Sequence, residues 1–194
     1  MRVIGGEFRS RLLKSLPGLD VRPTPDRLRE ALFNVLAPRI EGAVFADLYA
    51  GTGAVGIEAL SRGASRALFV EQNRAAVGVI RANLKSLGLE NRADVRQGRA
   101  SAVMATIHAA IVFLDPPYRL EEEYETALAW LGARPPQLVL VQHDPRRALA
   151  EFYGGLRRTR ILKHGDNCVS FYVAADTPNP VQTTPMPRTP PTPR

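Results

Sequence analysis

The sequence predicts one α/β domain, in which a mostly parallel sheet has helices on both faces and ends in a C-terminal antiparallel hairpin. Short apolar runs that are typical of buried strands alternate with stretches of helical periodicity, and such alternation indicates βαβ units. A length of 194 residues fits a single domain, and a hydrophobic content of 45% is enough for a packed core. Five strands and the two strands of the hairpin, described below, make the expected sheet seven-stranded.

The predicted elements follow from local patterns. Five buried strands are expected, at residues 43–49, 67–71, 94–97, 110–115 and 138–141. Helices are expected between them, at 54–61, 74–87 and 122–131, and Gly88 is expected to end the second of these. The hairpin is expected to pair 157–162 with 169–173 around a turn at 164–167.

Residues 1–41 are predicted to form a basic extension before the domain proper at 42–175. Thr24 is expected to cap a helix that starts at Pro25 and ends at Pro38. The apolar stripe of this helix consists of Leu28, Leu32, Val35 and Leu36. Residues 176–194 are rich in proline and nearly devoid of apolar side chains, so a disordered tail is expected there.

Arginine dominates the charged residues. The 26 Lys and Arg exceed the 19 Asp and Glu by seven, and only three of the 26 are lysines. This surplus reflects either a codon bias or a polyanionic partner, because the arginine fork matches phosphate geometry. Residues 1–29 hold seven bases and three acids, which is more than half of the net charge. This distribution favours a nucleic-acid partner that meets a basic N-terminal face.

The composition also excludes several classes of protein. Cys168 is the only cysteine, which excludes an internal disulfide framework and a multi-cysteine metal site. No apolar run approaches the roughly 18 residues of a membrane span, and the N-terminus lacks the apolar core of a secretory signal. We therefore expect a cytoplasmic protein that does not bind a membrane.

A glycine motif follows the first predicted strand. Gly51, Gly53 and Gly56 form the pattern GxGxxG, and Glu71 closes the next strand twenty residues after Gly51. Taken alone, this pattern is typical of dinucleotide binding, although a tight turn without a ligand would also satisfy it. Asp47 precedes the glycines, however, and its carboxylate would repel a pyrophosphate. That charge instead suits the cationic amino-acid end of S-adenosylmethionine.

A second motif, Asp115-Pro116-Pro117-Tyr118, ends the fourth strand, where open α/β sheets bind ligands. The two prolines lack backbone donors, so the carbonyl groups there stay available as acceptors. A carboxylate and a carbonyl can hold both hydrogens of an exocyclic amine and aim its lone pair at a methyl donor. Tyr118 can stack on a flipped base. The alternative is an exposed proline-rich turn.

The combination of DLYAGTGAVGIEALSRGA with DPPY resembles Rossmann-like, class I S-adenosylmethionine-dependent methyltransferases. More narrowly, the chain resembles the RsmD-type 16S ribosomal RNA guanine-N2 methyltransferases. Ile4-Gly5-Gly6 with Arg9-Ser10-Arg11, the run RPTPDRLREALFNVL and Gly165-Asp166 before Val169-Ser170-Phe171-Tyr172 carry this narrower match. The resemblance covers residues 1–174. It implies S-adenosylmethionine as the only cofactor, with no metal, because the donor carries its own positive charge.

The resemblance also implies roles for individual residues. The catalytic group would be Asp115, Pro116, Pro117 and Tyr118. The cofactor would be bound by Asp47, Tyr49, Gly51, Gly53, Glu71, Gln72, Arg99 and Ala100. RNA would be bound by Arg9, Arg11, Arg22, Thr24, Arg27 and Arg29. The implied partner is 16S ribosomal RNA within a partly assembled small subunit, and we expect a monomeric enzyme.

Two positions depart from the family pattern. Arg99 stands where an acidic residue near the adenine is usual, and Gln142-His143 replaces the acidic residue usual after the fifth strand. Other functions also stay open. DPPY-like motifs serve N6-adenine and protein-glutamine methyltransferases, and a non-catalytic RNA-binding ribosome assembly factor would share the basic face. Arg157, Arg158 and Arg160 could extend an RNA footprint, although solvated charge is the favoured interpretation.

Overall fold

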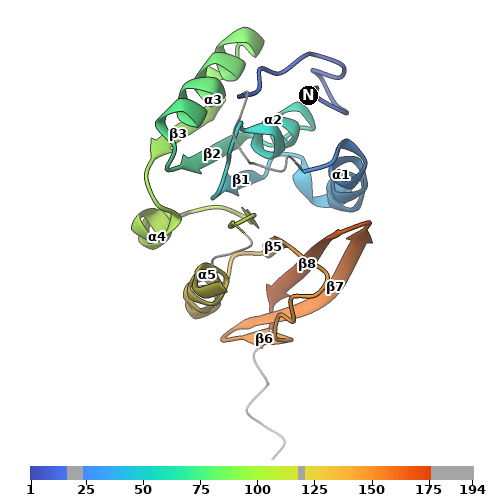
Figure 1. Cartoon of the computed structure of the whole chain (residues 1–194), viewed down its shortest axis with the longest axis vertical. Helices are drawn as coiled ribbons and strands as arrows, with labels where there is room; N and C mark the ends of the chain where they lie inside the picture. Colours follow the sequence, from blue (N-terminus) through green and yellow to red (C-terminus); the bar gives the residue numbers. More distant parts are fainter. Residues whose placement is uncertain (17–23, 118–120, 176–194) are drawn as a thin grey trace, which may run out of the picture.

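A computed structural model describes residues 1–16, 24–117 and 121–175. Its centre is one eight-stranded sheet with the strand order β3-β2-β1-β4-β5-β8-β7-β6 (Figure 1). The first five strands of that order are parallel, β8 is antiparallel to β5, and β7 is antiparallel to β8. This arrangement confirms the predicted α/β fold and its C-terminal hairpin. The two-residue edge strand β6 is an addition to the seven predicted strands.

The strands are β1 Val44–Asp47, β2 Arg66–Glu71, β3 Ala93–Gln97, β4 Ile111–Leu114, β5 Leu138–His143, β6 Phe152–Tyr153, β7 Leu156–His164 and β8 Asn167–Ala174. The helices are α1 Asp26–Ile40, α2 Ala54–Ser61, α3 Arg74–Leu87, α4 Ala100–Val103 and α5 Glu121–Ala133, with short 3-10 turns at Glu90–Arg92 and Met104–Thr106. The bounds of α2 and α3 match the prediction. Of the predicted site residues, Arg22 and Tyr118 lie outside the described residues, as does the tail at 176–194.

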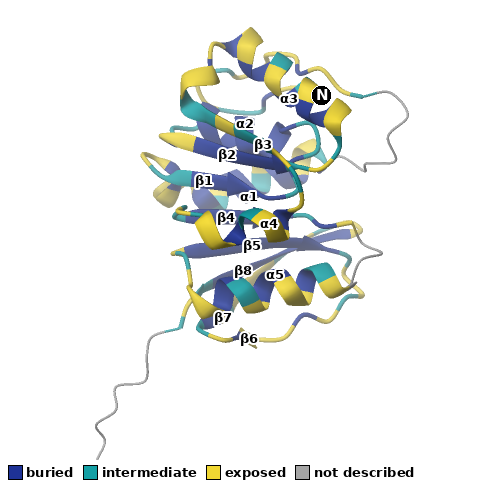
Figure 2. Cartoon of the chain, turned by 90° about the vertical axis from the view of Figure 1, so that its left-hand side faces the viewer, coloured by how far each residue is buried: buried dark blue, intermediate teal, exposed yellow. Residues whose placement is uncertain are grey.

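Alternating side chains divide the core between the two faces of the sheet. Phe45 of β1 packs with α1, whereas its neighbour Ala46 packs with α5. Helices α2 and α3 cover Phe69 on the same face as α1. Figure 2 shows buried strands between helices whose outer sides are exposed. None of the described helices is long and apolar enough to cross a membrane.

Helix α1 differs from its prediction at both ends. Pro25 is the N-cap, without a side-chain hydrogen bond, and the Thr24 hydroxyl instead donates to Gln142 Oε1 over 3.0 Å. The expectation that Thr24 caps the helix is therefore wrong. Pro38 lies inside the helix, which continues to the buried Ile40. Burial of Ile40 offsets the loss of one backbone hydrogen bond at a proline so close to the end.

The N-terminal residues pack on the outside of α2 and α3. Val3 and Leu13 are buried in the same cluster as Ile57 and Ile80. The backbone of Lys14 is held by Asn83 of α3, which accepts from the Lys14 N–H over 2.8 Å and donates to its carbonyl over 3.2 Å. The first 14 residues are thereby fixed against α2 and α3.

Candidate active site

The strand order reverses beside β1, because β2 and β3 continue on one side and β4 and β5 on the other. In open α/β sheets, such a switch point opens a crevice at the carboxyl ends of the strands. Three carboxyl groups lie along that edge. Glu71 ends β2, Asp47 ends β1, and Asp115 directly follows β4. Acidic side chains from three adjacent strands therefore meet at one edge.

The glycine loop links β1 to α2 and needs glycine for two different reasons. Gly51 and Gly53 have φ angles of 53° and 81°, a left-handed conformation that side chains disfavour. Gly56 needs space instead, because a Cβ there would lie 2.3 Å from the Phe69 ring on β2. The third glycine of the motif thus lets α2 lie directly on the sheet.

Glu71 holds this loop in place. Its Oε2 accepts from the Gly51 N–H over 2.8 Å, and its Oε1 accepts from the Asn73 N–H over 2.7 Å. The side chain is half-buried, and each carboxylate oxygen keeps a further acceptor site. Glu71 can therefore bind hydroxyl donors of a ligand while it keeps the loop folded.

Asp47 is the most deeply buried of the three acids, with 1% of its surface exposed. Its Oδ2 accepts from the Gly56 N–H in the first turn of α2 over 3.0 Å. Burial raises the pKa of Asp47 to about 7 despite this hydrogen bond, and the nearby charge of Glu71 raises it further. Asp47 therefore exchanges its proton near neutral pH.

Asp115 behaves in the same way. Burial and the charge of Asp47 raise the pKa of Asp115 to about 8. Because each carboxylate opposes ionisation of the other, the two groups titrate as a pair. A cation placed between these strand ends would lower both pKa values and draw off protons. The edge is thus suited to a positively charged ligand.

Helix α5 supports the loop that contains Pro116. The Tyr124 hydroxyl lies 3.1 Å from the Pro116 carbonyl oxygen and 3.2 Å from the Gln142 carbonyl oxygen. Pro116 is buried and Pro117 is exposed. On the same helix, Glu123 accepts from the Tyr49 hydroxyl over 2.7 Å. Burial raises the pKa of Tyr49, and contact with the Glu123 carboxylate raises it further. Helix α5 thereby ties together the loops after β1 and β4 and the end of β5.

The residues predicted near the adenine lie after β2 and β3. Gln72 and Arg99 are exposed, and Ala100 is the buried first residue of α4. The Gly98 N–H donates to the Glu71 carbonyl oxygen over 3.0 Å, which draws the loop after β3 against β2. These residues therefore border the same edge as Glu71, on the side away from Asp115.

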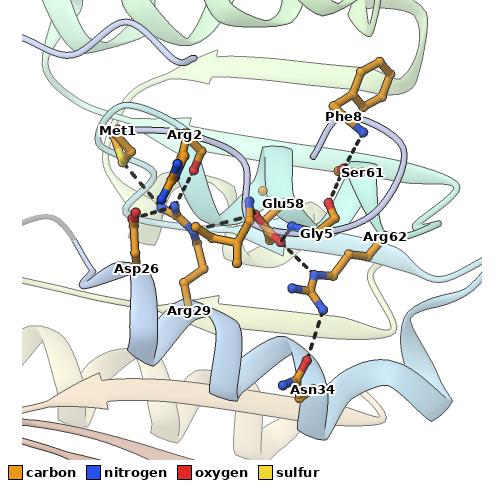
Figure 3. Close-up of polar contacts among 12 residues, drawn as sticks. Met1, Arg2, Gly5, Phe8, Asp26, Arg29, Asn34, Glu58, Ser61 and Arg62 are labelled. Atoms are coloured by element: carbon orange, nitrogen blue, oxygen red, sulfur yellow. Dashed lines mark hydrogen bonds and ion pairs between the residues drawn. The ribbon is translucent and has the colours of Figure 1, made fainter. Parts of the chain in front are cut away.

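The residues predicted to bind RNA do not all reach the surface. Arg9, Arg11 and Arg27 are exposed, whereas Arg29 has no exposed surface. Its guanidinium donates to the Arg2 carbonyl over 2.6 Å and to Asp26 over 2.9 Å (Figure 3). Arg29 is therefore corrected from an RNA contact to a buried anchor of the N-terminus.

Thr24 is corrected in the same way. Only 8% of its surface is exposed, and its hydroxyl is bound to Gln142. The hydrogen bond joins the start of α1 to the carboxyl end of β5. Thr24 therefore fixes α1 beside the candidate site and has no free hydroxyl hydrogen for RNA.

Two buried polar residues that organise this region were not predicted. Glu58 of α2 accepts from the backbone N–H groups of Ile4 and Gly5, both over 2.8 Å, and from Arg62 Nε over 2.7 Å (Figure 3). Asn83 donates to the Thr52 carbonyl in the glycine loop over 3.3 Å. Each places a polar group on an otherwise apolar helix face: Glu58 is the charged residue of AVGIEALS, and Asn83 is the amide residue of IRANLKSL. This pattern could have identified both residues from the sequence.

Over residues 1–173 the chain matches the protein family described as Conserved hypothetical protein 95. Bacillus subtilis YlbH, provisionally described as an rRNA methyltransferase, is 35% identical over 89% of this chain and 98% of its own length. The Ribosomal RNA small subunit methyltransferase D of Escherichia coli K12 is 45% identical over 121 residues, 61% of each chain. The solved structure of Escherichia coli yhhF, provisionally described as a methyltransferase, has a TM-score of 0.80 and 34% identity, and the match covers 90% of this chain and 98% of that one.

Proposed function

The chain belongs to the Conserved hypothetical protein 95 family, and on this premise we propose that it transfers a methyl group from S-adenosylmethionine to small-subunit ribosomal RNA. The names of its relatives support both the reaction and the substrate. The resemblance to RsmD-type enzymes is confirmed by the same matches. By that resemblance, the acceptor is the exocyclic N2 of a guanine.

The observation that carries this proposal is the row of carboxyl groups from Glu71, Asp47 and Asp115 beside the glycine loop. S-adenosylmethionine supplies a methyl group on a positively charged sulfur, and it also carries an ammonium group. Buried acids whose pKa values lie near neutrality fit such a donor, because its charge stabilises their ionised forms. The same acids would repel the pyrophosphate of a nicotinamide dinucleotide, which separates the two readings of the glycine motif.

Four residues would hold the donor on the β1–β2 side. Glu71 has acceptor sites left for the ribose hydroxyls, and the backbone of Gly51 and Gly53 allows close approach. Asp47 would supply the negative charge that meets the amino-acid end. Tyr49, Gln72, Arg99 and Ala100 border the same edge and complete the proposed donor site.

The acceptor amine would be held on the β4 side. Asp115 and the Pro116 carbonyl can each accept one amine hydrogen, which leaves the nitrogen lone pair aimed at the donor. One of the two lone pairs of the Pro116 oxygen faces Tyr124, and the other stays available. As the N–C bond forms, the bond between the methyl carbon and the sulfur would break, and the sulfur would leave as a neutral thioether. One amine hydrogen would leave as a proton, which ionised Asp115 can take. We also retain Pro117 and Tyr118 as proposed contacts of the target base.

The N-terminal extension and the domain proper would have different roles. Residues 1–41 would provide RNA contacts, and 42–175 would carry the transfer reaction. Arg9, Arg11, Arg22 and Arg27 are the proposed phosphate contacts of the N-terminal part. We propose that the enzyme is a cytoplasmic monomer. Its substrate would be a partly assembled small subunit, because the target guanine would still be accessible there.

Calorimetry and radiolabelled methyl transfer together test the proposal. Wild-type protein should bind S-adenosylmethionine but not NADH, and it should transfer tritiated methyl groups to 16S rRNA or small subunits lacking the modification. Nuclease digestion and mass spectrometry should then identify N2-methylguanine. Recovery of N6-methyladenine would replace the proposed acceptor, and donor binding without any transfer would favour an RNA-binding assembly factor instead.

A further inference from the structure

A groove of about 230 Å³ runs between α1 and the hairpin strand β7, on the face of the sheet that α1 covers. Val35 and Arg39 line it from α1, and Thr159 and Arg160 line it from β7. Phe171 and Val173 of β8 lie between them. The groove therefore has a basic group on each wall.

The two wall arginines are available for a ligand. Arg39 and Arg160 are both exposed, and no carboxylate within residues 1–16, 24–117 and 121–175 forms an ion pair with either. Arg157 adds a third charge, because its register partner is Val173, so its side chain lies on the groove face of the hairpin. Unpaired guanidinium groups that line a concave surface attract phosphate groups.

The groove lies at the amino edge of the sheet, where β5 begins, and one ridge of α1 runs from it to the edge that holds the candidate active site. Arg27, Ala31, Val35 and Arg39 recur at intervals of four along α1, so they share one ridge of the helix. Because Thr24 is bonded to Gln142, the Arg27 end of this ridge lies at the carboxyl edge of the sheet, and the Arg39 end lies at the opposite edge. Strand β7 runs parallel to β5, because both are antiparallel to β8, and it contacts α1. The six residues of β5 correspond to about 17–20 Å.

We propose that this α1–β7 groove binds the phosphate backbone of the RNA substrate, several nucleotides away from the base that is methylated. The inference rests on the proposed function for the identity of the RNA. Arginine forks contact phosphate oxygens in pairs, and such contacts position a nucleic acid without reading its sequence. Arg27 joins this track to the active-site edge, so one RNA strand could contact Arg27, Arg39 and Arg160 in turn.

Salt-dependent binding of transcribed 16S rRNA tests the groove. The double variant Arg39→Ala with Arg160→Ala should reduce the magnitude of the log–log salt slope by about 1.4–1.8, since each lost phosphate contact removes about 0.7–0.9. Affinity at low salt should fall about tenfold or more, while affinity for S-adenosylmethionine stays unchanged. The matched control removes Arg74 and Arg81, two exposed arginines of α3 at the far end of the sheet. The control should leave the slope nearly unchanged.

A second variant separates charge from packing. Arg39→Lys with Arg160→Lys keeps both charges and should keep most of the salt slope, and thermal melting checks that every variant is folded. The groove assignment would be wrong if the salt slope of the alanine variant were unchanged, or if the α3 control lost as much of the slope. It would also be wrong if the wild-type protein did not bind the RNA. Normal binding and slope effects without methyl transfer by wild-type protein would instead defeat the proposed function and leave the groove assignment intact.

Discussion

Asp47 and Asp115 couple proton binding to the stability of the free protein. Their pKa values are raised to about 7 and about 8, whereas an unfolded aspartate has a pKa near 3.8. Between those values the folded state binds more protons than the unfolded state, so stability falls as pH rises. Each unit of pKa difference corresponds to about 1.4 kcal/mol. At neutral pH the two acids thus lower the stability of the free protein, and a bound cationic donor would reduce this destabilisation.

This coupling predicts a pH-dependent variant effect. The double variant Asp47→Asn with Asp115→Asn should gain stability over wild type as pH rises from 5 to 9, by a few kcal/mol at the upper end. Urea unfolding at a series of pH values measures the difference. A stability difference that is flat between pH 5 and pH 9 would show that the two carboxyl groups titrate normally. Affinity of the wild type for S-adenosylmethionine should rise over the same interval, with proton release on binding.

Asp115 should be needed for the transfer step more than for donor binding. Asp115→Ala should reduce the rate by about 10²–10³-fold, the scale of losing one preorganised hydrogen-bonding group. Donor affinity should fall much less than the rate, because Asp47, Glu71 and the glycine loop are intact. Asp115→Asn keeps one carbonyl acceptor and should retain more activity. Single-turnover kinetics with saturating donor compare the three proteins, and a wild-type rate for the alanine variant would exclude Asp115 from the reaction.

At the residue scale, the motif acids could be predicted because strand, loop and helix signals surround them. Arg29 could not be placed correctly from a stripe of Leu28, Leu32 and Leu36. Arg29, Phe33 and Leu36 in fact share a face, and all are buried. A helical pattern shows that a position is inside but does not identify a charged partner on another element. That partner is Glu58, whose Oε2 lies 3.7 Å from Arg29 Nε.

At the scale of elements, the contact between α2 and β2 depends on Gly56. Gly56→Ala would place a methyl group 2.3 Å from Phe69, so α2 or the ring must move. Such overpacking should cost about 1–3 kcal/mol and weaken donor binding through the displaced loop. Gly78→Ala is the matched control, because nothing lies within 4 Å of its Cβ position in α3. The control should gain about 0.5–1 kcal/mol from helix propensity. Equal melting temperatures for the two variants would contradict this account.

Glu58 of α2 accepts two backbone N–H groups of the N-terminal segment and faces two arginines. Glu58→Gln removes the charge that Arg29 and Arg62 face and leaves a buried guanidinium poorly compensated. The variant should lose about 3–5 kcal/mol. Trypsin should also cleave it at Arg9 and Arg11 sooner than it cleaves wild type. Unchanged proteolysis would show that Val3 and Leu13 hold the segment without the ion pairs.

Local signals explain which elements could be predicted. The bounds of α3 were accessible because Asn73 caps its start, accepting from Ala75 and Ala76, and Gly88 ends it in a left-handed conformation. The end of α1 could not be predicted in this way, because it depends on the packing of Ile40 and not on Pro38. Strand β6 has two residues, too few for a periodic pattern, and exists because it pairs with β7.

At the scale of the whole molecule, the parallel part of the sheet carries the proposed chemistry and the flanking parts carry the proposed RNA contacts. The N-terminal segment lies outside α2 and α3, and the hairpin lies at the other end of the sheet. The N-terminal segment reaches the glycine loop at the carboxyl edge through Lys14 and Asn83, and helix α1 reaches the same edge through the bond of Thr24 to Gln142 on β5. The net charge of +7 was readable from the sequence. The pairing of α1 with β7 was not, because it joins residues more than 100 positions apart.

The central claim is methylation of a guanine N2 in small-subunit rRNA, and one measurement tests it most directly. Mass mapping compares the methylated nucleotides of 16S rRNA from wild-type cells and from cells that lack this gene. We expect one N2-methylguanine to disappear, and to return when the wild-type gene is supplied but not when the Asp115→Ala gene is. An identical set of N2-methylguanines in both strains, or loss of a methylated adenine instead, would contradict the account.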